Sequence, residues 1–183
     1  MKKYLILILL FCVSYQLMAQ IPVNSKAVIV ATLTVTDKSV GGVGLDFGTL
    51  SPGASTGWCE VTPLNVRKAT NCTALPLFPS SVAIFEVTGT KDLTYTVTVP
   101  ALGTKPTLYL NGDKTSTDIL HVDLFKVLTK NKATTNTLGN TVIGTLDASN
   151  KDEFYIGATL TDILYNQNPG TYTGTFNITA VYN

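Results

Sequence analysis

Polar and apolar residues alternate along most of this chain. In residues 93–99 every second residue is threonine, and Leu93, Tyr95, Val97 and Val99 lie between the threonines. Threonine on a wet face and apolar side chains on a core face are typical of a half-buried antiparallel strand. Similar runs predict further strands at residues 27–36, 45–50, 57–62, 81–88, 107–110, 119–128, 141–146, 153–160 and 171–182.

Turn-forming residues separate these runs. They include Gly41-Gly42, Ser51-Pro52-Gly53, Asn111-Gly112-Asp113 and Asn168-Pro169-Gly170. After the N-terminal 19 residues, no sustained spacing of three and four residues between apolar positions predicts a helix. About nine short strands in one span predict an all-β fold, an antiparallel β-sandwich formed by a single domain at residues 20–183.

The N-terminus has the features of a secretory signal peptide at residues 1–19. Lys2 and Lys3 precede an apolar run at residues 4–13, and Leu17-Met18-Ala19 forms a cleavage site. The apolar run is shorter than the roughly 20 residues that a membrane-spanning helix needs, so no retained transmembrane segment is expected. The mature protein is therefore predicted to be exported to the periplasm, the cell surface or the medium.

Export makes the two remaining cysteines candidates for a disulfide. Without Cys12, the mature chain keeps Cys59 and Cys72. An even number of cysteines in an oxidising compartment predicts that they pair. The bond would contribute about 3 kcal/mol by restricting the unfolded chain. Residues 60–71 would then form a surface hairpin or flap carrying Arg67 and Lys68, and Trp58 would pack over the disulfide.

Composition and charge exclude several kinds of function. Hydrophobic residues make up 45% of the chain and charged residues 14%, which argues against disorder, and the net charge of +1 offers no basic surface for nucleic acid. His121 is the only histidine, and it lies in the predicted strand at residues 119–128 beside alternating apolar residues. We expect a histidine at the rim of a strand, no enzyme activity, and no cofactor or metal.

Three segments resemble a family of exported bacterial proteins, the domain of unknown function 4402. They are residues 45–53 (LDFGTLSPG), residues 85–89 (FEVTG) running into residues 95–100, and residues 155–160 (YIGATL) followed by residues 170–176 (GTYTGTF). The resemblance implies an immunoglobulin-like fold similar to chaperone-usher pilins and spore coat U type proteins. The region around Cys59 and Cys72 departs from the family pattern.

The C-terminus is similar to the end of a pilin. Pilins end in a strand with glycine fourteenth from the end and an aromatic residue at the penultimate position, which Gly170 and Tyr182 occupy here. Tyr172, Phe176, Ile178, Ala180 and Tyr182 share one face of this predicted strand. In pilins that strand contacts a chaperone and borders a groove that a neighbouring subunit fills. Alternatively, it is an ordinary core strand that ends the domain.

The first predicted strand is a candidate donor for assembly by strand addition. A donor is extended, alternating and close to a free terminus. Ala27, Ile29, Ala31, Leu33 and Val35 share one face of it, but Val28 and Val30 make the other face apolar too, as in a central strand of the protein's own fold.

These features favour an exported, non-enzymatic structural or adhesive surface protein, similar to a pilin or fimbrial subunit. It would assemble with itself or bind a periplasmic chaperone. The alternative is a monomeric extracellular carbohydrate-binding module that recognises a surface glycan or host ligand through exposed aromatic residues such as Trp58.

Overall fold

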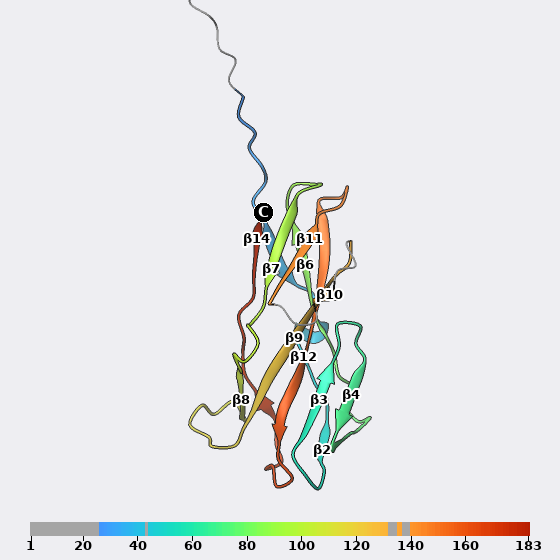
Figure 1. Cartoon of the computed structure of the whole chain (residues 1–183), viewed down its shortest axis with the longest axis vertical. Helices are drawn as coiled ribbons and strands as arrows, with labels where there is room; N and C mark the ends of the chain where they lie inside the picture. The colour runs from blue at the N-terminus through green and yellow to red at the C-terminus, as the bar shows by residue number, and fades with distance from the viewer. Residues whose placement is uncertain (1–25, 43, 132–134, 137–139) are drawn as a thin grey trace, which may run out of the picture.

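The computed structural model describes residues 26–42, 44–131, 135–136 and 140–183, and its strands pair antiparallel (Figure 1). A short 3-10 turn, η1, covers Val40–Gly42. The strands are β1 (Thr34–Asp37), β2 (Leu50–Pro52), β3 (Gly57–Val61), β4 (Arg67–Thr70), β5 (Cys72–Ala74), β6 (Ala83–Thr88), β7 (Thr94–Thr98), β8 (Thr107–Leu110), β9 (Ile119–Thr129), β10 (Thr135–Asn136), β11 (Thr141–Thr145), β12 (Lys151–Ile163), β13 (Tyr172–Thr173) and β14 (Thr179–Tyr182).

The strands form one large sheet, one small sheet and a separate pair. The large sheet has the order β1-β6-β12-β9-β8-β13, with β3 and β4 joined through β12 and β10 joined to β9. The small sheet has the order β11-β7-β14, and β2 pairs with β5. The all-β antiparallel fold class predicted from the alternating pattern is therefore confirmed.

Strand β12 organises the large sheet because it changes partner along its length. Its first half, from Lys151 to Ile156, pairs with β6, and its second half pairs with β3 from Ala158 onward. Its other edge pairs with β9. Gly157 lies at the change of partner, where an added side-chain carbon would lie 2.2 Å from the carbonyl oxygen of Val61. Only glycine allows the chain entering the β3–β4 turn to approach β12 so closely.

The core lies between the two sheets. Tyr95 and Val97 of β7 and Phe154 and Ile156 of β12 are fully buried. These residues occupy the alternate positions that the sequence pattern assigns to the core face. Their burial supplies the main stabilisation of the fold, since apolar area removed from water is the dominant favourable contribution.

One buried hydrogen bond joins the two sheets. The hydroxyl of Tyr95 donates to Oδ2 of Asp152 at 2.9 Å, and Oδ1 of Asp152 accepts from the backbone N–H groups of Asn131 (3.0 Å) and Glu153 (2.8 Å). Burial raises the pKa of the Asp152 carboxyl, although these hydrogen bonds act in the opposite direction. The Tyr95–Asp152 pair is thus a polar link that fixes how the small sheet sits on the large one.

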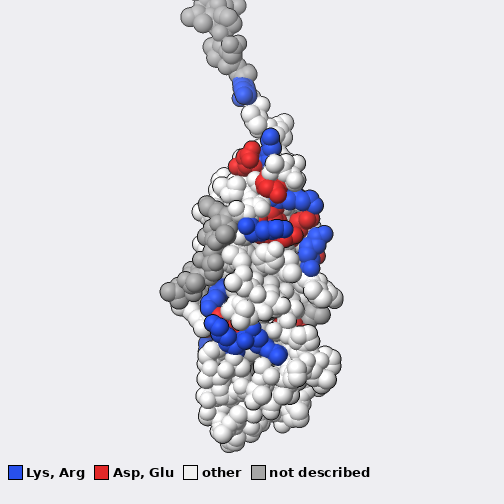
Figure 2. All heavy atoms as spheres, turned by 90° about the vertical axis from the view of Figure 1, so that its right-hand side faces the viewer, with Lys and Arg blue, Asp and Glu red and all other residues white. Residues whose placement is uncertain are grey.

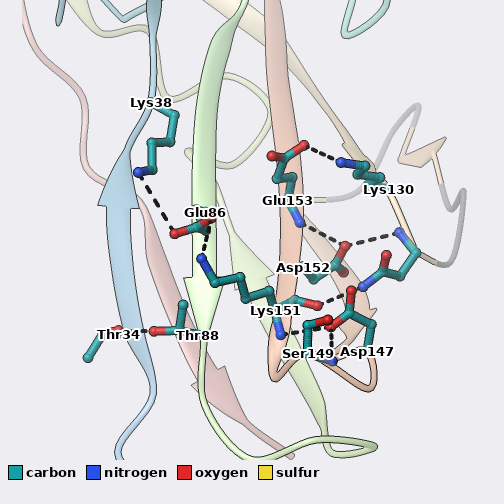
Figure 3. Close-up of polar contacts among 11 residues, drawn as sticks. Thr34, Lys38, Glu86, Thr88, Lys130, Asp147, Ser149, Lys151, Asp152 and Glu153 are labelled. Atoms are coloured by element: carbon teal, nitrogen blue, oxygen red, sulfur yellow. Dashed lines mark hydrogen bonds and ion pairs between the residues drawn. The ribbon is translucent and has the colours of Figure 1, made fainter.

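The outer face of the large sheet is covered by paired charges (Figure 3). Glu86 of β6 accepts a hydrogen bond from Lys151 (3.1 Å) and forms an ion pair with Lys38 (3.8 Å). Glu153 of β12 pairs with Lys130 at 2.9 Å. Figure 2 shows basic and acidic side chains interspersed over this part of the molecule. Exposed pairs contribute little stability, so this part of the face is a solvated surface.

The cysteine prediction is wrong for this structure, because Cys59 and Cys72 are both free thiols. Cys59 in β3 is fully buried in the core, whereas Cys72 lies beyond β4, in β5. The thiol of Cys72 donates to the carbonyl oxygen of Trp58 at 3.2 Å. The two thiols are near each other but not bonded, so Trp58 does not pack over a disulfide.

An arginine holds the region that the disulfide was expected to fix. Strands β3 and β4 form the predicted hairpin, but the Arg67 side chain turns inward instead of projecting with a flap. Its guanidinium donates to the carbonyl oxygens of Phe47 (3.2 Å) and Leu75 (2.9 Å). Arg67 thereby ties the hairpin to the segments that precede β2 and follow β5.

The strand predicted at residues 45–50 is also different in the structure. Gly48 adopts a positive φ of 70°, and its N–H donates to Oδ1 of Asp46 at 2.7 Å. This local turn interrupts the extended backbone, since an aspartate side chain competes with strand pairing. Only an isolated bridge from Asp46 to Ser81 and the short β2 remain.

Replacing Tyr95 by phenylalanine should destabilise the fold. The change removes the hydroxyl that donates to Asp152 and leaves Oδ2 of this buried carboxyl without that hydrogen bond. The free energy of unfolding, measured by urea titration, should therefore fall by about 1–3 kcal/mol. Tyr165→Phe is the matched control, because Tyr165 is 67% exposed. Equal unfolding midpoints for Tyr95→Phe and the wild type would contradict a stabilising link.

The two thiols should react at different rates in the folded protein. Burial, together with the nearby Cys72 thiol, raises the pKa of Cys59 to about 11. Since the thiolate is the reactive form, iodoacetamide should label the half-buried Cys72 several-fold faster than Cys59 in peptide mass spectrometry. In denaturant the rates should become equal. A cross-linked Cys59–Cys72 peptide in an unreduced digest would overturn the free-thiol arrangement.

Candidate functional site

The N-terminal end of the described chain extends away from the body (Figure 1). Strand β1 begins only at Thr34, so the strand predicted at residues 27–36 is shorter than expected. Ala27 is exposed, Ile29 is 96% exposed and Val28 is 73% exposed. Exposed apolar side chains grouped in one extended segment are typical of an interaction site.

The same segment is anchored where it meets the body. The backbone N–H of Ala31 donates to Oγ1 of Thr90 at 2.8 Å, and its carbonyl oxygen accepts from the Tyr182 hydroxyl at 3.0 Å. That hydroxyl also accepts from the backbone N–H of Thr90 at 2.7 Å. The C-terminal aromatic residue therefore clamps the point at which the N-terminal segment leaves the fold.

The candidate donor residues thus divide into two groups. Leu33 packs against the core, and Val35 of β1 pairs with Val87 of β6. Ala27 and Ile29 lie beyond the Ala31 anchor, outside the body. The second half of the predicted strand completes the protein's own sheet, and the first half is exposed.

The C-terminal residues have the predicted one-sided pattern. Five side chains pack against the core, namely Tyr172, Phe176, Ile178, Ala180 and Tyr182. The intervening residues are exposed. The ring of Phe176 contacts that of Phe125, with centroids 4.8 Å apart.

This C-terminal segment is not one continuous strand, contrary to the prediction for residues 171–182. Strand β13 pairs with β8 in the large sheet, and β14 pairs with β7 in the small sheet. Residues 174–178 cross between the sheets and belong to neither strand. Gly170 precedes β13 with a φ of 151°, where a side-chain carbon would lie 2.4 Å from Cδ1 of Leu110.

A long groove runs beside this crossing. Its volume is about 840 Å³. Its lining includes residues 173–177, Pro100 and residues 104–107. Tyr109 and Phe176 supply apolar surface, and threonine side chains supply polar groups. An open groove bordered by backbone outside the regular ladders can accept an extended chain.

Strand β14 presents a second unpaired edge. It is the outer strand of the small sheet, so only one of its sides pairs with β7. The backbone N–H of Asn183 donates to the carbonyl oxygen of Thr94 at 3.2 Å. Because backbone groups alternate in direction along a strand, those of the preceding residue, Tyr182, point away from β7. The C-terminal segment therefore borders the groove and also provides one edge strand of each sheet, β13 and β14.

The single histidine contacts an acid other than its neighbour in sequence. Nδ1 of His121 lies 3.1 Å from Oδ2 of Asp162, whereas the Asp123 carboxylate accepts from the N–H groups of Gly103 and Leu124. Across residues 26–42, 44–131, 135–136 and 140–183, no group of three His, Cys, Asp or Glu side chains is placed to hold a metal ion. Within the same residues, no helix has the length and hydropathy to cross a membrane.

Comparison with known proteins gives one match. Neither the curated proteins nor the solved structures contain a significant match to this chain. A family model, described as a domain of unknown function, DUF4402, matches residues 30–182. The match includes the edge strands β13 and β14 and the clamp formed by Tyr182, and begins within the exposed N-terminal segment. The chain therefore belongs to the DUF4402 family.

Proposed function

We propose that this protein is an exported, non-enzymatic surface subunit, similar to a pilin, that assembles by strand addition. The observation that carries the proposal is the exposed segment at residues 26–30, in which four apolar residues follow Lys26 and which leaves the body just before the Ala31 anchor. A segment of this kind loses exposed apolar area when it pairs with a partner, and its backbone gains hydrogen bonds.

The signal features at residues 1–19 support export, although these residues lie outside the part of the chain that the structure describes. Cleavage after Ala19 would leave Gln20 as the first residue, only a few positions before Ala27. The exposed segment would then lie near a free terminus, as a donor strand requires. The destination is the periplasm, the cell surface or the medium.

The groove beside residues 174–178 suits the exposed segment in length and chemistry. Residues 26–30 and residues 174–178 each span five positions, about 17 Å when extended. Ala27 and Ile29, which share one face of the segment, would cover the apolar surface of Tyr109 and Phe176. A periplasmic chaperone that supplies a strand would occupy the same groove before assembly.

The placement of the two surfaces favours pairing between copies. The segment leaves the body beside the end of β14, whereas the groove lies beside β8, toward the opposite end (Figure 1). Each copy would fill its neighbour's groove, which is a heterologous contact that repeats head to tail.

Purified residues 20–183 should give a ladder of oligomers on an unboiled denaturing gel, and boiling should remove it. Ile29→Asp should abolish the ladder, because it places a charge on the segment that enters the groove. Its effect on the monomer should be within about 0.5 kcal/mol, since Ile29 is exposed. Val40→Asp is the control, because Val40 is 72% exposed and lies outside the segment. A ladder that survives Ile29→Asp would refute this donor.

A mixture of two defective variants should stop at dimers. Ile29→Asp lacks a working donor, and Thr175→Trp blocks the groove at an exposed lining residue. Each variant alone should remain monomeric. When the two variants are mixed, the intact donor segment of Thr175→Trp should enter the intact groove of Ile29→Asp. Size-exclusion chromatography should then show a heat-labile dimer. Longer species, or no dimer at all, would argue against this pair of surfaces.

A further inference from the structure

A second cleft lies on the outer face of the large sheet, away from the groove used in assembly. It has a volume of about 370 Å³ and lies where β3, β12 and β9 run side by side. Its lining includes Trp58 and Glu60 from β3, Thr161 and Asp162 from β12, and Leu124 and Lys126 from β9. Nothing in the proposed assembly uses these residues.

Two breaks in strand register direct side chains into this cleft. Pairing of β12 with β3 is interrupted between Leu160 and Ile163, and Asp162 there has a positive φ of 64°. Leu160 and Ile163 are both core residues, so the break places Thr161 and Asp162 together on the outer face. A bulge that redirects a side chain in this way is frequent beside binding sites.

The second break has the same effect on β9. Pairing of β12 with β9 shifts between Gly157 and Thr159, and Leu124 opposite this point has a φ of 51°. A positive φ is costly for leucine and persists only where the surrounding structure enforces it. Two strained residues on neighbouring strands therefore meet at one cleft.

The two carboxylates of the cleft each keep one oxygen free for a ligand. Glu60 uses Oε1 to accept from Lys126 Nζ, and Asp162 uses Oδ2 to accept from His121 (3.1 Å) and Thr161 (3.0 Å). Lys105 also approaches Oδ2 of Asp162, at 3.7 Å. Among the described residues, Oε2 of Glu60 and Oδ1 of Asp162 have no hydrogen-bond partner.

Asp162 carries its charge at neutral pH. Partial burial acts to raise the pKa of its carboxyl, but the hydrogen bond from Thr161 and the charge of Lys105, with the contact from His121, together hold that pKa below its usual value. A free oxygen on an ionised carboxylate is a strong acceptor for a hydroxyl donor.

We propose that this cleft binds a neutral saccharide. Hydroxyl groups would donate to the free oxygens of Asp162 and Glu60 and accept from Lys126, and the apolar face of a sugar ring would pack on Trp58, which is 37% exposed. Two carboxylates disfavour an anionic ligand, and a purely apolar ligand would leave Oε2 of Glu60 and Oδ1 of Asp162 without hydrogen bonds. A ligand with both hydroxyls and an apolar face satisfies the whole cleft.

Trp58 is the only tryptophan of the chain, so its fluorescence reports on this cleft directly. The experiment titrates the full mature chain carrying Ile29→Asp with cellotetraose, chitotetraose and mannotetraose. This background removes assembly, so the outcome does not depend on the proposed function. At least one of the three probes should give a saturable blue shift at millimolar concentration or below.

Asp162→Asn should weaken that binding by about tenfold or more, because it removes the charge while asparagine tolerates the positive φ. Lys126→Met should weaken it as well, and it tests the site through a different strand. Phe78→Ala, an exposed aromatic residue outside the cleft, is the control and should leave the titration unchanged. Absence of a saturable shift with all three probes, or an unchanged affinity in both cleft variants, would overturn the proposal.

Discussion

The close approach at Gly157 is the constraint on which the large sheet depends. It lets β12 pair first with β6 and then with β3 while it keeps β9 on its other edge. A side-chain carbon at this position would meet the backbone of Val61 and Thr62. The chain would then have to move the β3–β4 hairpin away from β12, and the packing of Cys59 and Val61 in the core would be lost with it.

The two halves of β12 also have different surroundings on the outer face. Along the β6 half, Glu86 and Glu153 are matched by lysines, and the surface is simply solvated. Along the β3 half, register breaks bring an exposed tryptophan and two partly engaged carboxylates into a cleft. The surfaces proposed for assembly belong instead to the chain ends, where Tyr182 joins the N-terminal segment to the fold. Assembly and ligand binding would thus use separate parts of one domain.

The sequence predicts local features of this fold well because a strand repeats every two residues whatever its partner. The inward face of Tyr172, Phe176, Ile178 and Tyr182 follows from that spacing alone. The switch of this segment between two sheets does not, since pairing is set by residues far away in the chain. Strand β4 was expected only as part of a surface hairpin or flap, because Arg67 and Lys68 resemble a solvated loop, and β5 was not predicted. Likewise, no local pattern marks the positive φ of Leu124 or shows that Cys59 and Cys72 remain free thiols.

The central claim is that residues 26–30 are free in a single copy and paired in an assembly. Hydrogen–deuterium exchange, followed by mass spectrometry, measures this directly on the backbone amides of Val28, Ile29 and Val30. These amides should exchange rapidly in the isolated monomer and be strongly protected in the assembled fraction, together with new protection at residues 174–178. Protection of the N-terminal amides already in the monomer would contradict this claim, because the segment would then pair within its own domain.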